Sequence, residues 1–176
     1  SELVPLGVAG RDVLGQSRTG TGKTAAFGLP LLHRLAENPS PFSGLVLCPT
    51  RELAIQIAKD LQALAGDLPV KIMPVYGGQR MKVQSDKLKK GPHILVGTPG
   101  RVMDFHQRGE LPYDNIQMAV LDEVDRMLDI GFRDDIRRIL GGMTQKHQTI
   151  FVSATISEEI ERLARKYLTD PERLTH

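Results

Sequence analysis

Tryptophan is absent from this chain of 176 residues, and its aromatic residues amount to three tyrosines and five phenylalanines. So few aromatic rings argue against a protein that binds nucleic acids mainly by stacking on their bases. No apolar run approaches the ~20 residues of a membrane-spanning helix, and no charged and apolar leader of the secretory type opens the sequence. The sequence therefore predicts a protein without a membrane segment or a secretory signal.

A second scarcity is that of cysteine, because Cys48 is the only one and no internal disulfide can form. Cys48 ends the apolar run Gly44–Cys48, where a small buried residue is expected rather than a nucleophile. A single buried thiol is typical of a reducing, intracellular setting, and we expect a cytoplasmic protein. The five histidines have no spacing of the kind that metal ligands show.

Net charge is also small, at +2, so composition alone does not indicate a nucleic-acid-binding protein. Any basic surface must come from the local placement of lysines and arginines. Lys87, Lys89 and Lys90 are expected to form a solvated helix face rather than a binding patch.

Short apolar runs rich in β-branched residues alternate with longer segments of helical periodicity along the whole chain. The predicted strands are Asp12–Gly15, Gly44–Cys48, Lys71–Val75, His93–Gly97, Met118–Leu121 and Thr149–Val152. Strands that are apolar on both faces are typical of a parallel sheet covered by helices. The length predicts one domain. The expected fold is therefore α/β, with a mostly parallel sheet flanked by helices on both faces.

Three helices are indicated by their apolar periodicity. The first carries the stripe Leu53, Ile57, Leu61 and Leu64, and the others cover Arg133–Leu140 and Ser157–Leu168. Ser157 is a candidate N-cap. A further helix should follow residue 24, and Pro30 predicts a kink in it.

A glycine-rich segment after the first strand carries the clearest chemical signal. Its residues are Ser17, Arg18, Thr19, Gly20, Thr21, Gly22, Lys23 and Thr24. A strand that leads into such a loop, a lysine and a hydroxyl at a helix start is typical of a phosphate cradle, in which Thr24 can hold Mg²⁺. Ser17 stands where the general pattern has glycine, and the alternative is a glycine-rich turn with a solvated lysine.

Asp122 and Glu123 close the apolar run Met118–Leu121 in the form of a Walker B element. Asp122 can coordinate Mg²⁺ through water, and Glu123 is placed to orient and deprotonate an attacking water. The alternative is an acidic helix start, where Asp and Glu interact favourably with the helix dipole. With Lys23 and Thr24 present, the catalytic interpretation is favoured.

Further non-periodic clusters follow the other strands. They are Pro49-Thr50-Arg51-Glu52, Gly77-Gly78, Thr98-Pro99-Gly100-Arg101 and Ser153-Ala154-Thr155. Because the carboxyl ends of parallel strands share one edge, where open α/β folds bind ligands, all these clusters should lie together.

Each of these clusters has a chemical interpretation and a plain structural alternative. Thr98 is a candidate N-cap with Pro99 at N1, and Arg101 suits a backbone phosphate. Arg51 either binds phosphate or pairs with Glu52 or another carboxylate. Gly77-Gly78 permits close backbone approach or simply forms a turn. Ser153 and Thr155 are interpreted as a relay that touches Asp125.

Taken in order, these motifs resemble those of the DEAD-box RNA helicases, specifically their first RecA-like, P-loop NTPase domain, over almost the whole chain. Ser17–Thr24 resembles motif I, Pro49–Ala54 motif Ia, Gly77-Gly78 the glycine doublet, Thr98–Arg101 motif Ib, Asp122–Asp125 motif II and Ser153–Thr155 motif III.

The resemblance implies an ATP-dependent RNA helicase that binds ATP at residues 17–24 and Mg²⁺ through Thr24 and Asp122, with Lys23, Asp122 and Glu123 in catalysis. It implies RNA backbone over Pro49, Thr50, Arg51, Gly77, Gly78, Thr98, Pro99, Gly100 and Arg101. It further implies that Asp125, Ser153 and Thr155 couple hydrolysis to strand separation.

Three departures from the family pattern matter. Val124 replaces the alanine that names the family, at a packed junction where two extra methyl groups could cause about 1–3 kcal/mol of strain. The chain opens after the segment in which the family reads adenine. No residues resemble the second RecA-like domain, whose arginines assist hydrolysis. We therefore expect residues 1–176 to act as a fragment that binds nucleotide weakly and hydrolyses it barely alone.

Two rival functions stay open at this point. One is a nucleic-acid-stimulated ATPase acting on DNA, because phosphate contacts do not specify the sugar. The other is a RecA-like binding platform that has lost catalysis, for which Val124 is the only supporting feature.

Overall fold

The computed structural model describes residues 2–18 and 23–175, so the predictions for Thr19, Gly20, Thr21 and Gly22 lie outside the described residues. The strands are β1 (Val13–Gln16), β2 (Gly44–Leu47), β3 (Ile72–Val75), β4 (Ile94–Gly97), β5 (Met118–Asp122), β6 (Gln148–Ser153) and β7 (Glu172–Thr175). The helices are α1 (Leu3–Val8), α2 (Lys23–Ala36), α3 (Arg51–Ala65), α4 (Met81–Leu88), α5 (Pro99–Gln107), α6 (Val124–Ile130), α7 (Arg133–Gly142) and α8 (Glu158–Tyr167).

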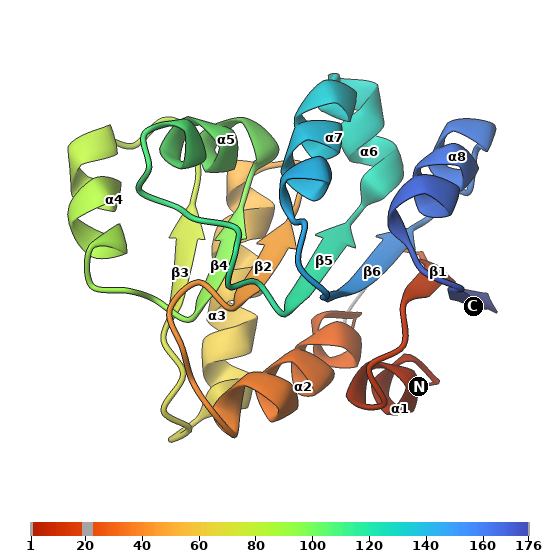
Figure 1. Cartoon of the computed structure of the whole chain (residues 1–176), viewed down its shortest axis with the longest axis horizontal. Helices are drawn as coiled ribbons and strands as arrows, with labels where there is room; N and C mark the ends of the chain where they lie inside the picture. Colours follow the sequence, from red (N-terminus) through yellow and green to blue (C-terminus); the bar gives the residue numbers. More distant parts are fainter. Residues whose placement is uncertain (1, 19–22, 176) are drawn as a thin grey trace.

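The described strands form one sheet in the order β3-β4-β2-β5-β6-β1-β7, and every pairing between neighbours is parallel (Figure 1). Each of the six predicted strands is confirmed to within one residue at either end. The sequence did not predict β7, which pairs with β1 at the edge of the sheet. The predicted α/β class is confirmed, with a sheet that is parallel at every described pairing rather than mostly parallel.

Helices cover both faces of this sheet, as β5 illustrates. Met118 and Val120 pack in one apolar cluster with residues of α2 and α3, such as Phe27 and Ile57. Ala119 and Leu121 belong to a second cluster with residues of α5 to α8, among them Phe105. Since successive side chains of a strand point to opposite faces, α2 and α3 lie on one side and α5 to α8 on the other.

Local capping explains where two helices begin. Thr50 accepts a hydrogen bond from the Leu53 amide at 3.2 Å, and Ser157 accepts one from the Ile160 amide at 3.3 Å, which confirms Ser157 as the N-cap of α8. Pro30 lies within α2, which the sequence predicted to kink there, and it does not end the helix.

Pro30 instead packs against α1, so closely that a Cβ atom on Gly7 would lie 2.5 Å from the Cγ atom of Pro30.

Among residues 2–18 and 23–175, none of the helices combines the length and the apolar character needed to cross a membrane.

Candidate active site

The carboxyl edge of the sheet gathers the candidate residues. Thr50 follows β2, Thr98 follows β4 and Glu123 follows β5, and these strands are parallel. Ser17 follows β1, and its amide donates to the Ser153 carbonyl at the end of β6 at 2.9 Å. The prediction that these segments share one edge of the sheet is therefore confirmed.

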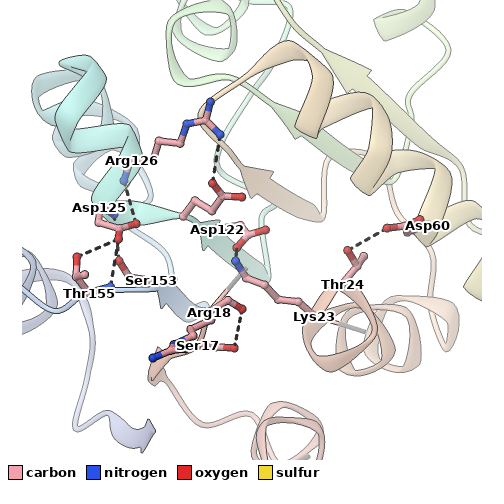
Figure 2. Close-up of polar contacts among 11 residues, drawn as sticks. Ser17, Arg18, Lys23, Thr24, Asp60, Asp122, Asp125, Arg126, Ser153 and Thr155 are labelled. Atoms are coloured by element: carbon pink, nitrogen blue, oxygen red, sulfur yellow. Dashed lines mark hydrogen bonds and ion pairs between the residues drawn. The ribbon is translucent and has the colours of Figure 1, made fainter. Parts of the chain in front are cut away.

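Lys23 and Asp122 form the closest charged contact at this edge, with 2.6 Å between Lys23 Nζ and Asp122 Oδ1 (Figure 2). Asp122 ends the central strand β5 and its side chain is only 4% exposed, while that of Lys23 is 12% exposed. Burial raises the pKa of Asp122 above its ordinary value, and the Lys23 ammonium opposes that rise. Lys23 and Asp122 therefore form an ion pair that is largely withdrawn from solvent.

Thr24, the other predicted magnesium ligand, is engaged elsewhere. Its Oγ1 donates to Asp60 Oδ2 at 3.2 Å, and Gln56 Nε2 donates to the other oxygen of Asp60 at 2.9 Å. Figure 2 shows the Thr24 hydroxyl pointing toward Asp60 rather than toward Asp122. Both predicted magnesium ligands, Thr24 and Asp122, are thus bound to other side chains of this chain.

Glu123 adopts a left-handed backbone conformation, with φ 55° and ψ 54°, as it leads from β5 into α6. Such a conformation is unfavourable for a residue with a side chain and is found where the surrounding structure imposes it, often at functional sites. Glu123 Oε1 lies 3.6 Å from Arg126 Nη1, and its side chain is 13% exposed. The carboxylate is therefore partly accessible at the same edge as Lys23.

Asp125 is held by the segment that follows β6, as the interpretation of a relay requires (Figure 2). Thr155 donates to Asp125 Oδ2 through its hydroxyl at 2.9 Å and its amide at 3.1 Å, and the Asp125 amide donates to Ser153 Oγ at 3.1 Å. Partial burial acts to raise the pKa of Asp125, but the bonds from Thr155 and from the Arg126 amide outweigh it and lower the pKa.

Arg51, at the start of α3, stacks over the Tyr76 ring, with 5.1 Å from its Cζ to the ring centroid. The pairing of Arg51 with Glu52 or another carboxylate is not seen among the described contacts. Gly78 has φ +89°, and a Cβ atom there would lie 3.0 Å from Arg51 Nη1. The positive φ favours glycine at position 78, and a Cβ atom there would displace the Arg51 guanidinium.

Arg101, in the first turn of α5, contacts the same loop. Its Nη1 donates to the Gln79 carbonyl at 3.3 Å, and its Cζ lies 5.9 Å from the Phe105 ring centroid. Thr98 and Pro99 occupy the N-cap and N1 positions of α5 as predicted, but the Thr98 side chain makes no capping bond. Residues 76–79 thus contact two arginines that come from different helices.

The remaining predicted residues have simpler surroundings. Pro49 is buried, Gly100 is half-buried in the first turn of α5, and Arg18 is exposed. Val124 is fully buried at the start of α6 in the second apolar cluster. Lys87, Lys89 and Lys90 are exposed as expected, although α4 ends at Leu88, so the last two lie just beyond it.

Sequence reasoning did not find Asp60, Tyr76 or Gln84. Gln84 is fully buried, between Met81 and Leu88 on the inner face of α4, so a polar residue at an apolar position was the available signal. Asp60 lies among polar residues of α3, and Tyr76 is a single aromatic before the glycine doublet. Nothing in their spacing points to Thr24 or Arg51.

A model of the DEAD/DEAH box helicase family matches residues 1–163. The chain belongs to this family. It is 45% identical over 174 residues to the DEAD-box ATP-dependent RNA helicase CshA of Bacillus cereus, covering 99% of this chain and 33% of that protein. It is 44% identical to the CshA protein of Bacillus subtilis, covering 98% of this chain and 35% of that protein.

Solved structures of DEAD-box proteins share the fold. A DEAD box protein from Methanococcus jannaschii superimposes with a TM-score of 0.92 at 38% identity, over 99% of this chain and 48% of that one. A hypothetical ATP-dependent RNA helicase from Sulfolobus tokodaii gives a TM-score of 0.91 at 32% identity, over 99% of this chain and 51% of that one. The DEAD-box chain described here spans about a third of the length of the CshA proteins it matches.

Proposed function

We propose that this chain is the first RecA-like domain of an ATP-dependent RNA helicase, and that it binds ATP with Mg²⁺ and the RNA backbone. The observation that carries the proposal is the buried Lys23–Asp122 pair, which lies next to Glu123 on the edge of the sheet that also carries Arg51 and Arg101. This placement supports a nucleotide site and a phosphate-binding surface on the same edge.

Lys23 is proposed to bind the β- and γ-phosphates of ATP. Its ammonium is bound to Asp122 at 2.6 Å, so it must exchange this partner for phosphate oxygens when the nucleotide enters. The exchange leaves the Asp122 carboxylate buried without its cation, which favours a second cation nearby.

Mg²⁺ suits that position, because Asp122 and Thr24 offer a carboxylate and a hydroxyl oxygen, the hard ligands this ion prefers. When bound, the ion neutralises charge on the phosphate oxygens. Thr24 has to release its hydrogen bond to Asp60 or direct a free lone pair toward the ion.

Glu123 is proposed to orient the attacking water and to accept its proton. Its carboxylate is tethered by Arg126 at 3.6 Å and stands one residue beyond Asp122. The constrained backbone at Glu123 sets the direction of its Cα–Cβ bond toward this edge, which limits the positions open to the general base.

The surface formed by Thr50, Arg51, Gly77, Gly78 and the start of α5 (Thr98–Arg101) is proposed to bind the RNA backbone. Two arginines and the first amides of two helices are suited to phosphates. Asp125 is proposed to couple this surface to hydrolysis, because its bonds to Ser153 and Thr155 join α6 to the end of β6.

Full activity is proposed to need a second RecA-like domain, as the share of the CshA proteins that this chain spans supports. An arginine from such a domain accelerates hydrolysis by about 10³–10⁵ in related enzymes. A cytoplasmic location stays a prediction from the sequence.

The test is Glu123→Gln in the full-length protein, with Asp129→Asn as the control, because Asp129 is an exposed carboxylate of the same helix α6. ATP turnover stimulated by RNA should disappear in the first variant and persist in the second, while both bind nucleotide normally. Unchanged turnover in Glu123→Gln would contradict the proposal. Stimulation by DNA as strong as by RNA of equal length would reassign the substrate.

A further inference from the structure

We propose that Gln84 of α4 is a positioning residue for nucleic-acid binding, which holds the loop Tyr76–Gln79 so that Arg51 and Arg101 present their guanidinium groups together. The inference rests on the proposed RNA surface and adds to it a residue that has no contact with that surface itself. Its basis is a pair of hydrogen bonds made by a fully buried side chain.

Gln84 binds the backbone of Tyr76 through both ends of its amide group. Its Oε1 accepts from the Tyr76 amide at 3.1 Å, and its Nε2 donates to the Tyr76 carbonyl at 2.8 Å. The side chain is 0% exposed. A planar amide that donates and accepts in this way replaces the neighbouring strand that an edge residue lacks.

Tyr76 needs such a partner because of its place in the sheet. It follows β3, which pairs with β4 and lies at the edge of the strand order. The Val75 carbonyl accepts from Thr98 on the β4 side, so the next residue turns its backbone groups outward, away from β4. Gln84 satisfies both of these groups and fixes the point where the chain leaves the sheet.

The loop that begins at this fixed point contacts both arginines. The Tyr76 ring lies under Arg51, and Gly78 passes so close to Arg51 that no Cβ atom fits without displacement. The Gln79 carbonyl accepts from Arg101. A shift of the loop would therefore move the supports of both guanidinium groups at once, although Arg51 belongs to α3 and Arg101 to α5.

Gln145 is a second glutamine that binds backbone groups, but it lies far from the loop Tyr76–Gln79. Its Nε2 donates to the carbonyls of Tyr113 and Ile116 at 2.7 and 2.9 Å, in the segment that leads into β5 at the opposite end of that strand from Asp122. This glutamine also ties down backbone, but at the edge of the sheet away from the arginines. Gln145 is half-buried whereas Gln84 is fully buried, so Gln145 provides a control for the loss of a backbone-binding amide rather than an exact match in burial.

The experiment compares Gln84→Met with Gln145→Met in the full-length protein. Binding of a fluorescein-labelled oligouridine is measured over a series of salt concentrations, and unfolding by urea is measured in parallel. We expect Gln84→Met to weaken binding about tenfold, the effect of one charged hydrogen bond. The slope of log K against log salt should become shallower by about 0.7 for each phosphate that the protein no longer neutralises. Gln145→Met should lower stability without changing either quantity.

Two further variants separate the possible failures. If Arg101→Met does not weaken binding, the proposed RNA surface is wrong. If Arg101→Met weakens binding while a folded Gln84→Met binds as the parent protein does, the role of Gln84 is wrong. Should Gln84→Met fail to fold, Tyr76→Leu keeps the backbone bonds and removes the ring under Arg51. That variant should lose affinity, and normal binding by it would overturn the inference.

Discussion

Replacing Lys23 with methionine should destabilise the fold in a way that depends on pH. The substitution removes the ammonium that lies 2.6 Å from Asp122 and leaves a carboxylate that is 4% exposed without a partner. Removing one partner of a buried ion pair typically costs about 3–5 kcal/mol. The carboxylate has an alternative, however, which is to bind a proton.

Protonation sets an upper limit to this cost. Protonating a carboxyl group of ordinary pKa 3.8 at pH 7 requires about 1.36 × 3.2, or about 4 kcal/mol, and at pH 5 about 1.6 kcal/mol. Loss of Lys23 raises the pKa of Asp122 further in the folded state. A group whose folded pKa is raised favours folding more as the pH falls. The penalty in Lys23→Met should therefore be about 2–4 kcal/mol at pH 7 and below about 2 kcal/mol at pH 5.

Urea unfolding at pH 5 and pH 7 measures both values. Lys59→Met is the control, since Lys59 is an exposed lysine of α3, and it should change stability by less than about 0.5 kcal/mol at either pH. Lys23→Met combined with Asp122→Asn should recover part of the loss, because no buried charge remains. A penalty that is equal at both pH values, or that the double variant does not relieve, would refute the reasoning.

Three other substitutions test separate parts of the edge. Gly78→Ala should lower the free energy of unfolding by about 1–2 kcal/mol, because φ at this position is +89°. It should also weaken RNA binding, because the new Cβ atom meets Arg51, and unchanged RNA affinity would contradict this. Val124→Ala should lower the free energy of unfolding by about 2 kcal/mol, because it leaves a cavity in the core. The rate of ATP hydrolysis should stay the same, and a faster rate would mean that the valine impairs the site. Thr155→Val should raise the lowered pKa of Asp125, as an NMR titration of its carboxyl group would measure. A carboxyl group whose pKa is lowered by folding stabilises the protein above pH 3.8, and this contribution is lost as the pH falls. The free energy of unfolding of Thr155→Val should therefore decrease less on acidification than that of the parent protein. An identical dependence of stability on pH would count against the hydrogen bond from Thr155.

The sheet was predictable wherever its strands are buried. β2, β4 and β5 are covered on both faces, and a continuous apolar run is all that such strands need to show. β7 was not predicted because three of its four residues, Glu172, Arg173 and Thr175, are polar and the strand is only half-buried. Its place is set by pairing with β1, and the ion pair between Arg173 and Glu161 is too exposed to add much. Neither contact can be inferred from its own four residues.

The same distinction applies to the site. Residues that follow a strand in a parallel sheet must come to the carboxyl edge, so Thr50, Thr98 and Asp122 could be placed together from topology alone. Their partners could not, because side chains meet across helices whose packing the sequence does not specify. Asp60 reaches Thr24 from α3, and Gln84 reaches Tyr76 from α4.

These partners explain how an edge with several charged side chains can be stable in the structure described. Lys23 neutralises Asp122, and the Thr24 hydroxyl is satisfied by Asp60. Under the proposed function, phosphate oxygens would replace the first contact and a metal ion would compete with the second. Asp60 lies on α3, the helix whose first residue is Arg51. A change at the Thr24–Asp60 contact would therefore act on the helix that begins at Arg51, so the proposed nucleotide site and the proposed RNA surface share one structural element, α3.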